Sequence, residues 1–261
     1  MRRKVLTILL VISVLVICIG GGIVYQKVQE ETASDAALDE IAELKPDLIE
    51  LPEDQVDGSQ SPGQTGSRPS EKTNGSRSVM DFAGIKTKNP DVIAWLTIPG
   101  TVIDYPIVQS KDNSYYLTHD AKKKKNLNGA LFLDYRVHSD FSDFNSVVYG
   151  HHMKSGRMFQ NLIKFKDQSF WNSHSTATLY TPEHTYRLEF IAVAVVQQNS
   201  PLYRYAFPSP TERLAHLEEI KSAAKFYRDV GLTENDRIVT LSTCSYEFKN
   251  ARTVLVAKIC G

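Results

Sequence analysis

The chain has 261 residues, which is enough for one or two ordinary domains, and its apolar fraction of 42% suits a globular core. Its 30 Lys and Arg residues balance its 30 Asp and Glu residues, so charge gives no reason to expect binding to nucleic acid or to an anionic surface. Three cysteines are too few for a disulfide scaffold. Only Cys244 lies inside a strand-like part of the chain, which makes it a candidate reactive thiol.

Residues 1–26 have the pattern of a membrane anchor. Three basic residues, 2–4, precede an apolar stretch over 5–25, which as a helix covers about 30 Å, the thickness of a bilayer core. A cleaved signal peptide has a shorter apolar region, whereas here apolar residues continue past the glycines 20–22. Acidic residues follow the stretch, so the N-terminus is expected in the cytoplasm and the rest of the chain outside. We therefore expect a single transmembrane helix.

Residues 27–79 are predicted to be an extracytoplasmic linker. The part over 27–50 is acidic and has the composition of a frayed helix. Residues 52–78 contain no aromatic residue and a single aliphatic one, Val56, so they cannot bury enough surface to offset the entropy of ordering. We expect a flexible spacer that holds the folded domain, residues 80–261, away from the membrane.

The folded domain consists mainly of short β-rich runs separated by turn residues such as Pro99-Gly100. Strands are predicted over 93–98, 102–108, 129–134, 145–150, 176–181, 185–197, 237–243 and 252–259. Eight strands suit a closed barrel, so the predicted fold class is mainly β, with an eight-stranded β-barrel.

Three helices are expected to interrupt these strands. Two short ones are predicted over 80–91 and 156–164. The longest, over 209–228, begins with Ser209, Pro210 and Glu212, which have the spacing of a capping box with proline at the first helical position. Its predicted apolar stripe consists of Leu214, Leu217, Ile220, Ala224 and Tyr227.

Cys244 lies at the end of a predicted strand, where a thiol can be partly exposed at the rim of a barrel. Burial as a small hydrophobic residue is the commoner fate of a cysteine, so position alone leaves both interpretations open. Arg252 opens the next strand, and a hairpin would return it beside Cys244. A guanidinium there would favour the thiolate or stabilise an oxyanion, although a merely solvated arginine is equally compatible with a strand end.

A cysteine nucleophile needs a proton donor for the leaving amine, and histidine suits this role at neutral pH. His151 and His152 follow the apolar run 147–150 and so lie at a strand end, as Cys244 does. In a strand they would point to opposite faces, so only one of them is expected to meet Cys244. Of the others, His119 and His138 lie in a polar segment and a loop, and three are expected to be exposed: His174, His184 and His216.

These motifs resemble those of a known family. The segment TLSTC (240–244), the arginine that opens the next strand and the segment YGHHM (149–153) look like those of sortases. The long helix before the cysteine strand and three further segments are similar to class B sortases: WLTIPGTVIDYPIV (95–108), YYLTHD (115–120) and GALFLDYR (129–136). The resemblance covers about residues 80–261.

The resemblance implies a sortase-type barrel and a cysteine transpeptidase of Gram-positive bacteria. Such an enzyme cleaves the C-terminal sorting signal of a secreted surface protein, holds the protein as a thioacyl intermediate and transfers it to an amine of a peptidoglycan precursor. Carried onto this chain, the resemblance makes Cys244 the nucleophile, His151, directly after glycine, the general acid and base, and Arg252 the group that stabilises the oxyanion or the substrate. Ser242 and Thr243 adjoin the nucleophile and are candidates for the substrate pocket, although barrel packing is the favoured role of Thr243.

Two alternatives remain open. A sortase that polymerises pili would use a lysine amine of another pilin as acceptor, and the residues do not separate it from wall anchoring. A non-catalytic binding module on a membrane stalk would leave Cys244 with ordinary thiol reactivity.

The expected site needs no cofactor. The His and Cys residues do not have the spacing of a zinc site, so no metal is predicted. The sequence also shows no clear Asn or Asp that orients His151. Asp140 and Asp143 are candidates, but loop roles are favoured for both.

Overall fold

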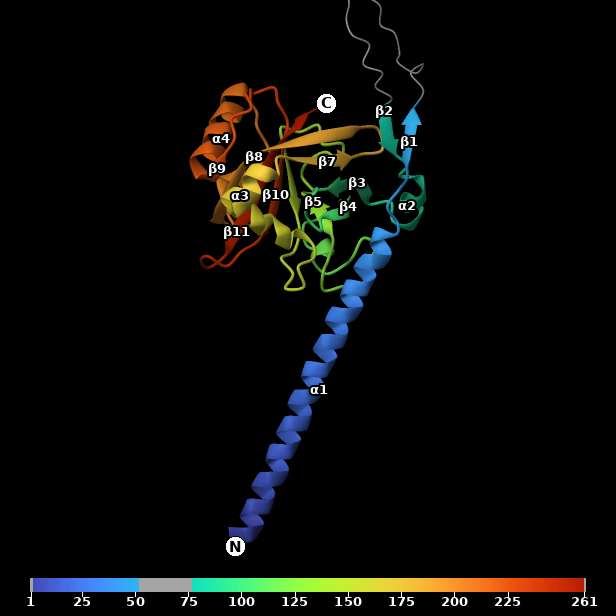
Figure 1. Cartoon of the computed structure of the whole chain (residues 1–261), viewed down its shortest axis with the longest axis vertical. Helices are drawn as coiled ribbons and strands as arrows, with labels where there is room; N and C mark the ends of the chain where they lie inside the picture. The colour runs from blue at the N-terminus through green and yellow to red at the C-terminus, as the bar shows by residue number, and fades with distance from the viewer. Residues whose placement is uncertain (1, 52–76, 261) are drawn as a thin grey trace, which may run out of the picture.

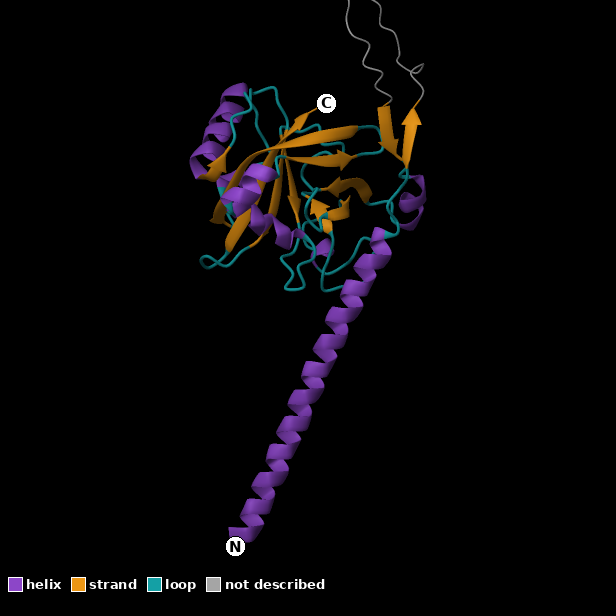
Figure 2. Cartoon of the chain, in the orientation of Figure 1, coloured by secondary structure: helices purple, strands orange, loops and turns teal. Residues whose placement is uncertain are grey.

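The computed structural model describes residues 2–51 and 77–260. Eight strands form a closed ring, and Figures 1 and 2 show them gathered in one body. The strands follow the order β11-β10-β6-β5-β4-β3-β7-β8, and pairing of β8 with β11 closes the ring. They are β3 (Val92–Thr97), β4 (Asp104–Val108), β5 (Leu131–Leu133), β6 (Asn145–Tyr149), β7 (Thr176–Tyr180), β8 (Thr185–Gln197), β10 (Ile238–Cys244) and β11 (Ala251–Cys260). Each corresponds to one predicted strand, so the predicted eight-stranded barrel is confirmed.

The strand that carries Cys244 is buried on both of its faces. The inward side chains of the barrel, such as Trp95 and Leu241, form one core cluster. A second cluster lies outside the sheet, where helix α4 (Pro210–Ala223) packs Leu217 and Ile220 against Ile238. Six of the seven residues of β10 are therefore buried, and only the end of the strand at Cys244 reaches a partly exposed position.

Shorter helices connect the strands at the rim. They are α2 (Ala83–Lys88), η1 (Tyr115–Leu117), η2 (Phe159–Lys166), α3 (Gln168–Ser173) and η3 (Pro201–Tyr203). The helix predicted over 80–91 is thus shorter than expected. The one predicted over 156–164 is a 3₁₀ helix that begins later, at Phe159.

Helix α4 begins where the sequence predicts and ends earlier. The Ser209 hydroxyl accepts a hydrogen bond from the Glu212 amide at 3.3 Å, as an N-cap does. The predicted helix runs to 228, but residues Ala224–Tyr227 form strand β9 beside β8. Leaving the helix lets the backbone of these four residues hydrogen-bond to an edge of the sheet that would otherwise stay unpaired.

The buried face of α4 differs from the predicted stripe. His216, expected to be exposed, is 1% exposed, whereas Leu214 is 44% exposed. The His216 ring packs edge-on against Phe144, and its Nδ1 lies 3.3 Å from the carboxylate of Glu219. Burial lowers the pKa of His216 and so favours the neutral imidazole.

The N-terminal helix α1 (Arg2–Ala42) extends from the barrel as one continuous rod (Figure 1). The predicted anchor over 1–26 falls largely on this helix, and Met1 and the side chains of 2–12 and 14 lie outside what the structure describes. Within the described part of the chain, none of the helices is long and apolar enough to cross a membrane. The anchor over 1–26 stays a prediction.

The far end of α1 docks on the barrel, within the segment that the sequence predicts as a linker over 27–79. Leu38 and Ile41 are each 2% exposed and belong to the barrel core cluster. Ion pairs flank them: Arg157 with Asp39 at 2.8 Å, Lys122 with Glu40 at 2.6 Å and Lys45 with Asp104 at 2.8 Å. Packed residues therefore begin well before residue 80, because two apolar side chains in the mostly polar C-terminal part of α1 contact the apolar surface of the barrel.

Two short strands flank the remaining part of the predicted linker. Strand β1 (Leu48–Leu51) pairs antiparallel with β2 (Arg77–Met80), and Leu51 lies opposite Arg77. The part of the predicted linker over 52–76 lies outside the described residues.

Replacing Leu38 by alanine is expected to loosen the docked end of α1. Large-to-small changes in a core cost about 2–5 kcal/mol, and the docked segment is held by few apolar contacts. Amide hydrogen exchange over residues 34–42 should accelerate, whereas exchange in β10 and β11 should stay slow. Val28→Ala, at a position of the same helix that is 52% exposed, is the control. Equal protection of residues 34–42 in both variants would contradict the docking described here.

Candidate active site

A cavity of about 520 Å³ opens at the rim of the barrel where β6 and β10 end. Its walls come from six segments that are far apart in the sequence. They contribute Asn113, Leu117, Phe132, Arg136, Tyr149, Gly150, His151, Gln198, Asn199, Tyr203, Ser242, Thr243, Cys244 and Arg252. All five residues that the sequence predicts for the site therefore lie in one cavity.

Cys244 and Arg252 face each other across the β10–β11 hairpin. The two strands are antiparallel, and these two residues are direct partners in the register. Both residues are half-buried, and Cys244 is a free thiol. The predicted return of the arginine to the cysteine is thus confirmed, and a guanidinium and a thiol share the mouth of the cavity.

The parallel pairing of β6 with β10 places His151 at the same edge as Cys244. Tyr149 lies opposite Ser242, and the Gly150 amide donates to the Ser242 carbonyl at 3.1 Å. A Cβ at Gly150 would come within 2.5 Å of the Leu131 side chain, so a larger residue does not fit there. Gly150 therefore lets the chain pass close to Leu131 and Phe159 between β6 and His151.

A backbone carbonyl orients the His151 ring. Its Nε2 lies 2.7 Å from the carbonyl oxygen of Leu117. A carbonyl only accepts hydrogen bonds, so Nε2 carries the proton in this arrangement and Nδ1 is the nitrogen left for proton exchange. The two candidate carboxylates lie elsewhere: Asp143 is 3.0 Å from Nδ1 of His138, and Asp140 accepts from the Ser142 amide.

The neighbouring His152 also reaches the end of β10, although the strand pattern predicts that it points away. Its Nδ1 is 2.8 Å from the carbonyl oxygen of Cys244, and its ring packs edge-on against Tyr246. The chain has left β6 at this point, so strict alternation no longer applies. His152 contacts the backbone of the cysteine, whereas His151 lines the cavity.

Ser242 and Thr243 both line the cavity while being almost fully buried. The Ser242 hydroxyl lies 2.8 Å from the hydroxyl of Tyr203. Burial raises the pKa of Tyr203, so its phenol remains neutral at physiological pH. Of the segment 199–207, Asn199 and Tyr203 reach the cavity, and the described residues of α4 do not line it.

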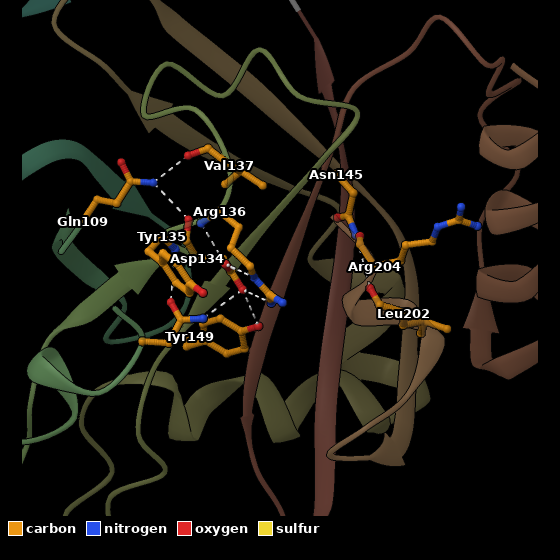
Figure 3. Close-up of polar contacts among 10 residues, drawn as sticks. Gln109, Asp134, Tyr135, Arg136, Val137, Asn145, Tyr149, Leu202 and Arg204 are labelled. Atoms are coloured by element: carbon orange, nitrogen blue, oxygen red, sulfur yellow. Dashed lines mark hydrogen bonds and ion pairs between the residues drawn. The ribbon is translucent and has the colours of Figure 1, made fainter. Parts of the chain in front are cut away.

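A buried carboxylate that the sequence analysis missed holds three residues of the cavity wall in place (Figure 3). Asp134 has a fully buried side chain, and its carboxylate accepts from Arg136 at 2.7 and 2.8 Å, from Asn113 at 3.0 Å and from the Tyr149 hydroxyl at 3.1 Å. All three donors line the cavity. The Arg136 guanidinium also lies 3.9 Å from the ring centre of Tyr205.

The charges in this network hold Asp134 ionised. Burial by itself would raise the pKa of Asp134, but the hydrogen bonds and positive charge of Arg136, with the amide of Asn113, keep it below its ordinary value. The pKa of Arg136 is raised in turn, chiefly by its hydrogen bonds to Asp134. Arg136 and Arg252 are both cationic, and no described carboxylate lines the cavity. The site is therefore suited to a neutral peptide that develops negative charge.

Replacing Asp134 by asparagine is expected to weaken substrate binding more than the chemical step. The change keeps the size of the side chain but removes the charge-assisted bond to Arg136, and such bonds contribute about 1.5–3 kcal/mol. We expect KM for a substrate peptide to rise on the order of tenfold, with a smaller change in kcat and unchanged reaction of Cys244 with a methanethiosulfonate reagent. Asp140→Asn, in an exposed loop of the same segment, is the control. A fall in kcat at constant KM would contradict this positioning role.

Comparison with known proteins agrees with the fold. The family model of the sortase domain matches residues 96–260. Sortase B of Listeria monocytogenes is 37% identical over 190 residues, which are 72% of this chain and 77% of that protein.

Solved structures give the same result. The X-ray structure of Clostridium perfringens sortase B superposes with a TM-score of 0.66 at 36% identity, covering 69% of this chain and 100% of that one. A sortase B–substrate complex from Staphylococcus aureus has a TM-score of 0.65 at 30% identity, covering 68% of this chain and 83% of that one. This chain therefore belongs to the sortase family of cysteine transpeptidases, and its relatives are class B sortases.

Proposed function

We propose that this protein cleaves the C-terminal sorting signal of secreted surface proteins and transfers them to an amine of a peptidoglycan precursor. The observation that carries the proposal is the meeting of a free thiol, an imidazole and a guanidinium, those of Cys244, His151 and Arg252, in one cavity. These are the nucleophile, the proton-transfer group and the cation that amide acyl transfer requires.

The first half of the proposed reaction is acylation. The Cys244 thiolate attacks the carbonyl carbon of the scissile amide, and the resulting oxyanion is stabilised by the guanidinium of Arg252 on the facing strand. Protonated His151 then gives a proton to the leaving amine as the C–N bond breaks, which leaves a thioester on the cysteine. The Leu117 carbonyl keeps the same ring nitrogen protonated throughout, so Nδ1 is the atom assigned to proton transfer.

The second half returns the enzyme to its starting state. An incoming amine loses a proton to His151 and attacks the thioester carbon, and the C–S bond breaks to release the thiolate of Cys244. Among the described residues, no carboxylate contacts the ring of His151. No such partner therefore stabilises the His151 imidazolium beside the Cys244 thiolate. The proposed enzyme is therefore slow, since a minority of molecules hold both groups ionised together.

The cavity walls support an extended peptide as substrate. Three amide side chains, those of Asn113, Gln198 and Asn199, line it together with the hydroxyls of Ser242 and Thr243, and both kinds of group hydrogen-bond readily to a peptide backbone. One solved sortase B is described as a substrate complex and another as a complex with triglycine. We infer from this likeness a peptide donor and a peptide amine acceptor, which favours wall anchoring over joining of pilins through lysine.

The proposed location is the outer side of a cell membrane, with the N-terminus in the cytoplasm. This part of the proposal rests on the apolar sequence over 5–25 and its basic flank. The continuity of α1 from Arg2 to Ala42 would then place the barrel close to the bilayer. Residue 34, whose serine hydroxyl accepts from the Leu127 amide of the barrel, follows residue 25 by nine helical steps, which is about 13 Å.

A peptide assay tests the proposed function. The full chain is incubated with labelled peptides of the LPxTG and NPxTN types, with and without triglycine, and the products are separated by chromatography and identified by mass. We expect cleavage between the last two residues of one motif type and, with triglycine, a product joined to its amine. Absence of cleavage of every peptide of both types, by a chain whose barrel is folded, would overturn the proposal.

A further inference from the structure

A second groove of about 560 Å³ adjoins the catalytic cavity on the side of α1. One wall is the helix, through Glu30, Ala33, Ser34 and Ala37, and the other is the loop that follows η1. The loop contributes Leu117, Thr118, Asp120, Lys124, Lys125, Asn126 and Leu127, and His151 completes the lining. Because Leu117 and His151 also line the catalytic cavity, the two spaces meet at the imidazole.

The walls of this groove are held in place by contacts between the helix and the loop. The Ser34 hydroxyl accepts from the Leu127 amide at 3.4 Å, and Lys122 pairs with Glu40 at 2.6 Å. The buried side chain of Leu38 follows Ser34 one turn later along α1 and packs in the barrel core. The groove is therefore a feature of the folded unit, formed only because α1 continues past the predicted anchor and packs on the barrel.

The charges along the groove suit a ligand with an ammonium group. Glu30 and Asp120 both line it. Asp120 is 1% exposed; its Oδ1 accepts from the amides of Lys122 and Lys124 at 2.8 and 3.0 Å, whereas its Oδ2 has no hydrogen-bond partner among the described residues. A buried carboxylate oxygen without a donor is costly, and a donor from a bound ligand would satisfy it.

We propose that this groove, which we call the α1 groove, admits the acceptor: a short peptide with a free amino terminus and small side chains. This inference rests on the proposed transpeptidase function. With the sorting signal in the catalytic cavity, an amine that reaches His151 through the α1 groove arrives at the base without displacing the acyl chain. The carboxylates of Glu30 and Asp120 attract its ammonium, and the lysines 124 and 125 face the peptide's carbonyl or carboxylate groups.

The transfer of the acyl group to the amine needs no further reactant. The ammonium loses one proton to solvent and the amine loses a second to His151, an N–C bond forms at the thioester carbon, and the C–S bond to Cys244 breaks. The proton on His151 then remains for the next leaving amine or returns to the thiolate. Water that enters instead of the amine gives hydrolysis, so the occupancy of the α1 groove decides between transfer and hydrolysis.

Filling the groove tests the proposal. Ala33 is exposed and lines the α1 groove, whereas Ala36, also exposed, does not line it. We expect Ala33→Phe to raise the KM for triglycine at least tenfold and to shift products toward hydrolysis, while the release of the leaving peptide without triglycine stays unchanged. Ala36→Phe is the matched control and should behave as the unaltered chain.

A second pair of variants tests the charge instead of the shape. Glu30→Gln should raise the KM for triglycine several-fold at low salt and by a smaller factor at high salt. Glu31 does not line the groove, so Glu31→Gln is the control and should leave the KM for triglycine unchanged. An unchanged KM in both Ala33→Phe and Glu30→Gln, or an equal rise in their controls, would overturn the α1 groove as the acceptor site. If the unaltered chain releases no leaving peptide, the proposed function fails instead, and the two failures are thus distinguishable.

Discussion

Replacing Cys244 by alanine is expected to abolish cleavage of the sorting peptide and its transfer to triglycine. Cys244 carries the only thiol among the described residues that line the cavity with His151 and Arg252, and no thioester forms without it. Losses from removing a nucleophile are on the order of 10⁴–10⁶ in kcat. The measurement is product formation by quantitative mass spectrometry over hours, which detects residual turnover of this size.

The control for this variant is the other thiol of the barrel. Cys260 lies at the end of β11 near Glu189, and burial raises its pKa, so Cys260→Ala should leave both reactions intact. Circular dichroism and thermal unfolding should be the same for the two variants, because Cys244 is half-buried at a strand end. Transfer that survives in Cys244→Ala would assign the chemistry to another residue.

Replacing His151 by alanine is expected to lower kcat/KM by about 10²–10⁴, the usual contribution of a general acid and base. The reason is positional: His151 lines the same cavity as Cys244 and its ring is oriented by the Leu117 carbonyl, so a group that can protonate the leaving amine shares the cavity with the nucleophile. The rate of acylation, followed by release of the leaving peptide in single-turnover experiments, should fall together with the rate of transfer.

His152→Ala separates this role from that of its neighbour. His152 contacts the Cys244 carbonyl and Tyr246 but does not line the cavity. We expect this variant to lower activity by less than about tenfold, through a looser end of β10, because one neutral hydrogen bond contributes about 1 kcal/mol. The opposite order, with His152→Ala inactive and His151→Ala active, would move the proton-transfer role to His152.

Much of the barrel is predictable because its strands carry local signals. Alternating and β-branched runs bounded by turn residues, such as 185–197, coincide with observed strands. The same reasoning fails at 224–227, where the helical stripe of α4 continues in the sequence but an open sheet edge captures the backbone. It also fails at His216, whose burial depends on Phe144 and Phe207 from other elements.

The docking of α1 shows a second limit of local pattern. Residues 27–42 are polar on average, so only Leu38 and Ile41 mark the contact, and two apolar residues in a charged helix carry little information on their own. The surface that receives them is assembled from β4, β5 and the loop before η2. The sequence does not show where those segments meet, and so local pattern predicts a flexible linker there.

The candidate site, too, is only partly predictable from local sequence pattern. Cys244, His151 and Arg252 are predictable because each lies at the end of a strand-like run, and the parallel and antiparallel partners of β10 bring these ends to one edge. The group that orients His151 is a main-chain carbonyl, which has no signature in a sequence. Asp134 was missed because a lone aspartate after a short strand looks like a turn residue until its three donors are placed around it.

The most direct measurement is the intact mass of the full chain after brief incubation with a cleavable sorting peptide in the absence of amine, followed by acid quenching and peptide mapping. The proposed function predicts a mass increase equal to the N-terminal acyl fragment, located on Cys244 and lost when triglycine is added, as the joined product appears. Cleavage of the peptide with the acyl group on any other residue, or with none on the protein at any time during turnover, would contradict it.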